Sequence, residues 1–187
     1  PIIEYASKIS GVAYGASEET DVSLKVIADH ARSMTIMIMD GILPSNEGRG
    51  YVLRRILRRA IRHGRMLGIK DKFLEGAVDA VYEIYKDASD FGALGQKKDY
   101  IKKVIALEED RFSATLEQGI ELLDGYIADT KAAGSKVLSG ELSFKLYDTF
   151  GFPWELTEEI LHEQDMELDK EGFDKEMQAQ RDRARAA

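Results

Sequence analysis

The sequence predicts an all-α, multihelical fold with one long helix and at most a scrap of β-structure. Only 3 of the 187 residues are proline, so few positions interrupt a helix. Apolar residues recur three and four positions apart over most of the chain, which is the spacing of one helix face. Ala, Leu, Glu and Lys, which all favour helices, are abundant in these segments. A chain of this length can bury roughly 70% of the surface that its unfolded form exposes.

The N-terminal segment predicts a short apolar start and then one buried helix. Residues 1–20 combine a few apolar positions with a loop rich in Gly, Ser and Glu. We expect Asp21 to cap a helix that runs to about Met39, because a side-chain oxygen can accept from the free N–H groups of a first turn. The end of this helix is apolar on all sides and should be buried. Asp40 and Gly41 are expected to terminate it.

A second helix is expected after a turn-rich loop at residues 42–50, and it should end near Gly68. Its charge is unusual, because seven arginines and no acidic residue occur over 17 positions. Without these seven, the 26 basic residues fall to 19 against 34 acidic ones, a net charge of −15 instead of −8. From the second turn on, the arginines lie within roughly 140° of arc, opposite the apolar residues. The arginine set consists of Arg49, Arg54, Arg55, Arg58, Arg59, Arg62 and Arg65.

The pattern that follows predicts a helix at residues 72–86, a linker at 88–96 and one long helix from about 97 to 133. Together with the preceding helices these form a predicted helical bundle at residues 1–134. Val137 is β-branched and its neighbour Leu138 is apolar, and the pair predicts a very short strand.

The C-terminal part, residues 135–187, is predicted to be a smaller helical portion of the same domain. Ser139 should cap a short helix that Gly151 ends. Pro153 suits the first turn of the next helix. Asp169 should cap a last, polar helix that continues to the C-terminus.

The arginine set has more than one interpretation. A guanidinium is a planar fork that matches phosphate oxygens and stays charged, so this helix face can bind nucleic acid. The surplus carboxylates of an acidic chain can also pair with these arginines inside the protein. An acidic protein partner or a membrane surface is a third interpretation. A membrane fits less well, because the opposite face of the helix is needed for the core.

The residues by themselves indicate no active site, metal centre or membrane span. The chain has no cysteine, which rules out disulfides and thiolate metal ligands and is compatible with a reducing compartment such as the cytoplasm. His30, His63 and His162 lack metal-binding spacing, and we expect His63 to extend the basic face of its helix. No apolar run approaches the ~20 residues of a membrane helix. We therefore expect no catalytic residue, no metal and no cofactor in this chain.

One acidic residue stands out. Asp148 precedes the predicted end of a helix at Gly151, where the helix dipole disfavours an anion. Either it is a simple solvated acid or it is held there for a purpose.

Two motifs carry a resemblance to a known family. The first runs from Asp40 to Arg55 and reads D-G-I-L-P-S-N-E-G-R-G-Y-V-L-R-R. The second runs from Leu146 to Pro153 and reads L-Y-D-T-F-G-F-P. With the arginine repeat after the first motif, the chain resembles the helical, tRNA-recognising middle domain of alanyl-tRNA synthetases over essentially its whole length.

This resemblance implies a parent protein that is a class II aminoacyl-tRNA synthetase, which activates alanine with ATP and transfers it to tRNA. In the family a catalytic antiparallel-sheet domain precedes this region and a zinc-binding editing domain follows it. Neither is present here, and the chain begins Pro-Ile-Ile rather than with Met, so we expect an excised piece that is inactive alone. ATP, magnesium and zinc are implied only for the full-length parent. The implied partners are the acceptor stem of tRNA(Ala) and the catalytic and editing domains.

The family reads a G·U wobble pair in the acceptor stem, and two positions carry over to this chain as candidate base readers, Asn46 and Asp148. A-form RNA exposes base edges in its wide minor groove, where guanine presents its 2-amino donor. An Asn carbonyl and an Asp carboxylate are suitable acceptors for it. The arginine set would then supply position and affinity. The alternative is a structural helical module whose arginines form internal ion pairs or bind a protein partner.

Overall fold

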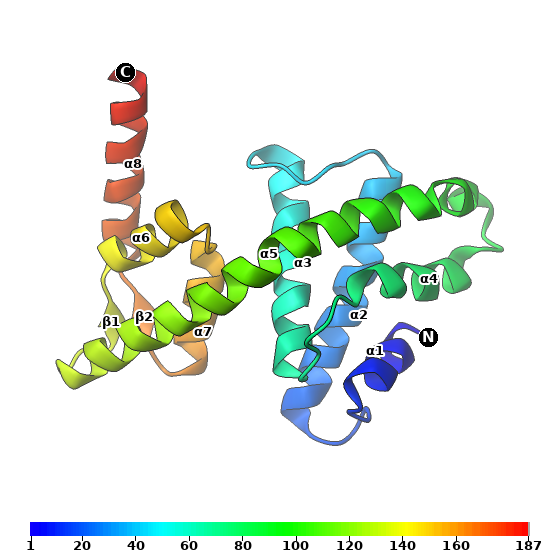
Figure 1. Cartoon of the computed structure of the whole chain (residues 1–187), viewed down its shortest axis with the longest axis horizontal. Coiled ribbons are helices and arrows are strands. Elements are labelled where there is room, and N and C mark those ends of the chain that lie inside the picture. Colours follow the sequence, from blue (N-terminus) through cyan, green and yellow to red (C-terminus); the bar gives the residue numbers. More distant parts are fainter. Residues whose placement is uncertain (187) are drawn as a thin grey trace. The chain divides into compact units, whose positions relative to one another are not determined.

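The computed structural model describes residues 1–186 and is almost entirely helical in that range (Figure 1). The all-α prediction is confirmed, because the described residues contain eight α-helices, one of them 41 residues long, and two strands of two residues each. The elements are, in chain order, α1 (Ile2–Ser10), α2 (Glu18–Met39), α3 (Gly48–Met66), α4 (Leu74–Tyr85), η1 (Ser89–Phe91), α5 (Gly92–Ala132), β1 (Val137–Leu138), α6 (Gly140–Phe150), α7 (Trp154–Glu163), β2 (Glu167–Leu168) and α8 (Lys170–Ala186).

The chain divides into two compact units, unit 1 at Pro1–Ser113 and unit 2 at Ala114–Ala187. The division lies inside α5, whereas the sequence analysis placed its division at residue 134. No loop or turn marks the point, since α5 is continuous and has buried apolar side chains on both sides of it, Ile105 in unit 1 and Leu123 in unit 2 among them. A boundary of this kind leaves no trace in hydrophobic periodicity.

In unit 1, α2 contacts α1, α3 and α4. Its N-cap is Ser17, whose Oγ accepts from the backbone N–H of Thr20 at 3.2 Å. The prediction that Asp21 is the cap was wrong, because the helix has already begun at that residue. The Asp21 carboxylate instead accepts from the backbone N–H of Gly15 at 2.7 Å and so holds the preceding loop. The helix ends at Met39, as predicted.

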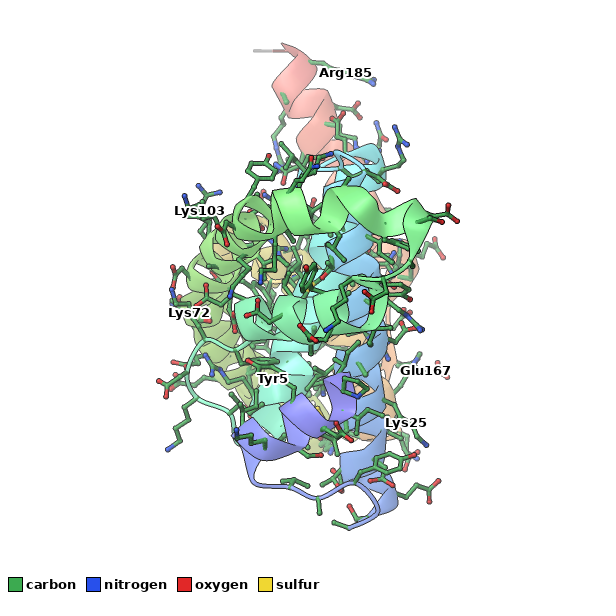
Figure 2. The ribbon with its side chains drawn as sticks, turned by 90° about the vertical axis from the view of Figure 1, so that its right-hand side faces the viewer. Tyr5, Lys25, Lys72, Lys103, Glu167 and Arg185 are labelled. Atoms are coloured by element: carbon green, nitrogen blue, oxygen red, sulfur yellow. The ribbon has the colours of Figure 1, made fainter. Side chains whose placement is uncertain are left out.

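Residues 2–10, expected only as a short apolar start, form helix α1. Gly11 ends it in the left-handed conformation with φ +72°. Tyr5 ties this helix to unit 1, since its hydroxyl donates to the carbonyl of Phe73 at 2.7 Å; Figure 2 labels it beside α4. A Cβ at Gly76 of α4 would clash with the Tyr5 ring, so only glycine fits there. Burial, with nearby carboxylates, raises the pKa of Tyr5 to about 12.

The segment at residues 88–96 was predicted as a linker, and this was wrong. It contains η1 and the first turn of α5. Two apolar residues of this mainly polar segment, Phe91 and Leu94, pack against other side chains. The ring of Phe91 lies against that of Tyr85 with a centroid distance of 4.4 Å, and Leu94 is fully buried. These contacts order a segment that composition alone describes as a loop.

Helix α5 is tied to the start of α4 by Glu109, which is 1% exposed. Its two carboxylate oxygens accept from the backbone N–H groups of Phe73 and Leu74 at 3.0 and 3.1 Å. The carboxylate thereby satisfies donors at the helix N-terminus that no residue of α4 caps. Burial raises the pKa of Glu109, and the two N–H donors oppose that rise.

Unit 2 contains α6, α7 and α8 and one short parallel strand pair. The predicted strand at Val137–Leu138 is confirmed, and it pairs with Glu167–Leu168, which the sequence analysis did not predict as a strand. Two residues are too few for a recognisable period, so the second strand depends on its tertiary partner.

The predicted caps of unit 2 are confirmed. The Oγ of Ser139 accepts from the N–H of Leu142 at 3.3 Å, and the carboxylate of Asp169 accepts from the N–H of Gly172 at 2.9 Å. Gly151 ends α6 with φ +67°. The core of the unit includes an aromatic cluster in which Phe144, Tyr147 and Trp154 surround Phe173 at centroid distances of 5.8–6.1 Å.

A candidate RNA interface around the arginine helix

The loop that precedes α3 lies directly on the first turn of that helix. A Cβ at Gly50 would clash with the carbonyl oxygen of Leu43 and with the side chain of Ser45. The loop can therefore approach this closely only because residue 50 is glycine. The Oγ of Ser45 donates to the carbonyl of Glu47 at 2.8 Å. These contacts hold the backbone on both sides of Asn46.

Asn46 is exposed, and its amide oxygen is engaged by an arginine two turns into α3. Its Oδ1 accepts from Nη1 of Arg54 at 2.6 Å. Arg54 is itself held by Glu108 of α5, with Nε–Oε2 and Nη2–Oε1 distances of 3.0 and 3.1 Å. The side chains of Arg54 and Glu108 are 18% and 10% exposed. A bidentate, largely buried pair of this kind has a well-defined geometry.

A second guanidinium lies near the same carboxylate. Nη1 of Arg111 is 3.5 Å from Oε1 of Glu108, and its side chain is 72% exposed. The charge of Glu108 is therefore balanced on the protein side by Arg54 and from the solvent side by Arg111.

Other members of the arginine set lie against neighbouring groups of unit 1. The guanidinium of Arg58 lies over the ring of Phe112, 4.9 Å from its centroid. Nη1 of Arg65 donates to the carbonyl of Ile69 at 2.6 Å, beyond the end of α3. This contact ties the end of α3 to the loop that follows it.

Arg59 lies next to His30 of α2, with Nη1 3.3 Å from Nε2 of the imidazole. Since a guanidinium only donates, Nε2 is the acceptor, and Nδ1–H is left to donate to the carboxylate of Asp29 at 3.0 Å. Burial lowers the pKa of His30, while the hydrogen bond to Asp29 works in the opposite direction. A neutral imidazole is thus compatible with the adjacent guanidinium.

Arg62 and His63 are both buried, with exposed fractions of 5% and 3%. The prediction that His63 extends the basic face was wrong. It lies three residues after Ala60 and four before Leu67, which places it on the apolar side of α3. Its Nδ1 is 3.0 Å from the Oγ of Ser23 in α2, so it forms part of the α2–α3 interface.

The two most accessible members of the arginine set are Arg49 and Arg55, which are exposed at the start of α3, close in sequence to Asn46. The other five members of the arginine set are half-buried or buried. The assignment of all seven to RNA phosphates stays a prediction.

Asp148, the other candidate base reader, lies in unit 2 on the last turn of α6 and is exposed. Its carboxylate accepts from the side-chain amide of Gln180 in α8. The position next to the helix C-terminus, predicted from the sequence, is confirmed by the end of α6 at Phe150. This hydrogen bond is exposed, and Gln180 itself is half-buried.

Glu108 is not among the site residues predicted from the sequence, although a signal for it exists. Apolar residues of α5 recur at Ile101, Ile105 and Phe112, and Glu108 falls between them on the same seam. An acid on a buried seam needs a cationic partner, and the arginine-rich α3 is the obvious source. Among residues 1–186 no group of three or more His, Cys, Asp or Glu side chains could hold a metal ion. No helix in that range is both long and apolar enough to cross a bilayer.

Comparison with known proteins identifies the family. The model of the family described as "tRNA synthetases class II (A)" matches residues 1–187. An alanine–tRNA ligase of Thermoanaerobacter sp. (strain X514) is 54% identical over 186 residues, and those of Clostridioides difficile (strain 630) and Natranaerobius thermophilus are 50% and 49% identical. Each alignment covers 100% of this chain and 21% of the relative, so the chain spans about a fifth of the relatives' length. The chain belongs to the class II (A) family of tRNA synthetases.

Proposed function

We propose that this chain is the tRNA-recognition part of an alanine–tRNA ligase and binds the acceptor stem of tRNA(Ala), where Asn46 and Asp148 read the G·U wobble pair from the minor groove. The observation that carries the proposal is the placement of Asn46. Its amide is exposed and held in one orientation at the start of a helix that also presents Arg49 and Arg55 to solvent. An oriented polar group beside exposed cations is what selective binding to a nucleic acid requires.

The chemistry of the two candidate base readers fits a guanine 2-amino group. That group is a donor, and in a wobble pair it is left unused by uracil, so it can be bound by an acceptor from the protein. The carboxylate of Asp148 offers such an acceptor on an exposed surface. The Oδ1 of Asn46 uses one lone pair for Arg54, and its second lone pair can accept from the RNA.

In this proposal the arginines have two roles, contacts with RNA phosphates and shaping of the protein surface. Arg49 and Arg55 are accessible and supply phosphate contacts, which are sequence-independent and weaken with salt. Arg54, Arg58 and Arg65 are less exposed and lie against other groups of unit 1, so they mainly shape the surface. Specificity then comes from the candidate base readers and general affinity from the exposed cations.

The parent enzyme is proposed to attach alanine to tRNA, with ATP and magnesium in its catalytic domain and zinc in its editing domain. Those two domains are the proposed intramolecular partners of this chain, and the cytoplasm is its proposed location. The present chain supplies recognition in this scheme and no catalytic residue. Activity would therefore require the longer ligase that contains it.

The test is a binding titration with two acceptor-stem minihelices that differ only in one base pair, G·U in one and G·C in the other. We expect tighter binding to the wobble minihelix at both low and moderate salt, with weaker binding to both RNAs at the higher salt. The titration is run with the 187-residue chain and with the full-length ligase. Equal affinity for the two minihelices in both proteins would contradict the proposal and favour a structural helical module.

A further inference from the structure

We propose that Glu108 and Arg54 are positioning residues for Asn46, so that the specificity of this site depends on a carboxylate of α5 that touches no RNA. This inference rests on the proposed function of Asn46. It adds that the candidate base reader is oriented by a chain of three side chains, Glu108 to Arg54 to Asn46, drawn from α5, α3 and the loop before α3.

The first link is the fork between Glu108 and Arg54. Both carboxylate oxygens are used, one by Nε and one by Nη2, at 3.0 and 3.1 Å. Two parallel hydrogen bonds fix the plane of the guanidinium, which a single contact cannot do. The low exposure of both side chains keeps water from competing for these bonds.

The second link is the hydrogen bond that the remaining nitrogen of the same guanidinium, Nη1, donates to Asn46. With Nε and Nη2 occupied, Nη1 is directed at Oδ1 of Asn46 at 2.6 Å. An arginine has no acceptor atom, so the amide must present its oxygen to Arg54 and turn its NH₂ group away. The donor that it faces thereby determines the orientation of the Asn46 amide.

The backbone of the loop is held independently of this chain. The contact of Leu43 and Ser45 with Gly50 leaves no room for the loop to shift toward α3. The hydrogen bond from Ser45 to the carbonyl of Glu47 closes the loop around Asn46. With both backbone and side chain fixed, little conformational entropy remains to be lost when RNA binds.

A purely structural role would not require this arrangement. A buried ion pair gains little over apolar side chains of the same size, because desolvation offsets the attraction. Joining α3 to α5 therefore does not explain why the third donor of the arginine should reach an exposed loop residue. A role in orienting Asn46 explains that contact and the choice of arginine together, since a lysine cannot hold two carboxylate oxygens in a plane and a third group as well.

The experiment measures the affinity ratio between G·U and G·C minihelices in the full-length ligase. Two conservative variants break the chain of side chains. Arg54→Lys keeps the charge and removes the fork, and Glu108→Gln keeps the shape and removes the charge. The matched control is Arg111→Lys, which alters another cation beside the same carboxylate but does not contact Asn46. We expect the ratio to fall about tenfold in both test variants, the equivalent of one charge-assisted hydrogen bond, and to stay unchanged in the control.

A double variant separates positioning from a general effect on the fold. When Arg54→Lys is added to Asn46→Ala, the ratio should fall no further, because the residue that Arg54 positions is gone. Thermal unfolding of each variant, followed by circular dichroism, verifies that the protein is folded at the temperature of the titration. A fold defect would weaken binding to both minihelices and leave the ratio intact.

Three results would overturn the inference, and they can be told apart. If Asn46→Ala lowers the ratio while Arg54→Lys and Glu108→Gln preserve it, the proposed function stands and the positioning role is wrong. If Arg54→Lys still lowers the ratio in the Asn46→Ala background, Arg54 acts on the RNA by another route. If Asn46→Ala itself leaves the ratio unchanged, both the proposed function and this inference fail.

Discussion

Asn46 and Asp148 differ in how their side chains are supported. Asn46 is joined to a largely buried guanidinium, which is joined to a largely buried carboxylate. Asp148 accepts an exposed hydrogen bond from the half-buried Gln180. The first side chain is fixed before any partner arrives, and the second can turn at little cost. In the proposed recognition, Asn46 is therefore the rigid base reader and Asp148 the adaptable one.

The largest expected effect comes from removing each candidate base reader in turn. Asn46→Ala and Asp148→Ala should each lose about 1–3 kcal/mol of preference for a G·U over a G·C minihelix. Because Asn46 is preorganised, its loss should appear mainly as faster dissociation from the wobble minihelix. Both quantities follow from binding kinetics with the two RNAs. If either variant weakened binding to both RNAs by the same factor, that residue would not be a base reader.

The next largest effect is on stability, and it tests the packing of α5, the helix that carries Glu108. Glu109 holds α5 against α4 next to Glu108, and Glu109→Ala leaves two buried N–H groups of Phe73 and Leu74 without their acceptor. We expect a loss of about 1–3 kcal/mol in the free energy of unfolding, measured by urea titration. A change within the error of the titration would mean that other groups take over these donors.

The same carboxylate gives a pH dependence of known sign. Burial raises the folded-state pKa of Glu109 above its ordinary value of 4.5, so the folded state binds its proton more tightly than the unfolded state does. The contribution of Glu109 to the free energy of unfolding is therefore greatest below pH 4.5, and it is lost as the pH rises through the raised pKa. Glu109→Gln should flatten this part of the curve of unfolding free energy against pH. An identical pH curve for wild type and variant would contradict the assignment.

These two carboxylates also illustrate what the sequence could and could not predict. Apolar periodicity predicted α2, α3, α4 and most of α5, because each is an amphipathic helix of three or more turns. Periodicity can place Glu108 on a buried seam of α5, but it could not identify the partners of Glu108 and Glu109, which lie 54 and about 36 residues away in the sequence. The motif around Asn46 identified the candidate site, but its support came only from the tertiary structure. Likewise, Ser17 and Asp21 are both good capping residues, and only the fold determines which one caps.

A smaller effect separates affinity from specificity within the arginine set. Arg55 is exposed, whereas Arg58 is stacked on Phe112. Arg55→Ala should weaken binding to both minihelices and lower the slope of log affinity against log salt by about 0.9, by analogy with duplex DNA. The control is Lys86→Ala, which removes a charge that is paired with Glu83. An unchanged slope in Arg55→Ala would assign this arginine to the fold.

The smallest expected effect on the affinity ratio comes from Gln180, which contacts Asp148 as Arg54 contacts Asn46. An exposed hydrogen bond between surface side chains contributes little, because water replaces the donor when it is removed. Gln180→Ala should therefore change the G·U to G·C affinity ratio by less than about twofold, against about tenfold for Arg54→Lys. Both substitutions remove a group that contacts a candidate base reader. Arg54 is itself held by the buried carboxylate of Glu108, whereas the hydrogen bond from Gln180 to Asp148 is exposed. If Gln180→Ala cost as much as Asp148→Ala, Asp148 would also depend on a fixed support, and unit 2 would be as preorganised as unit 1.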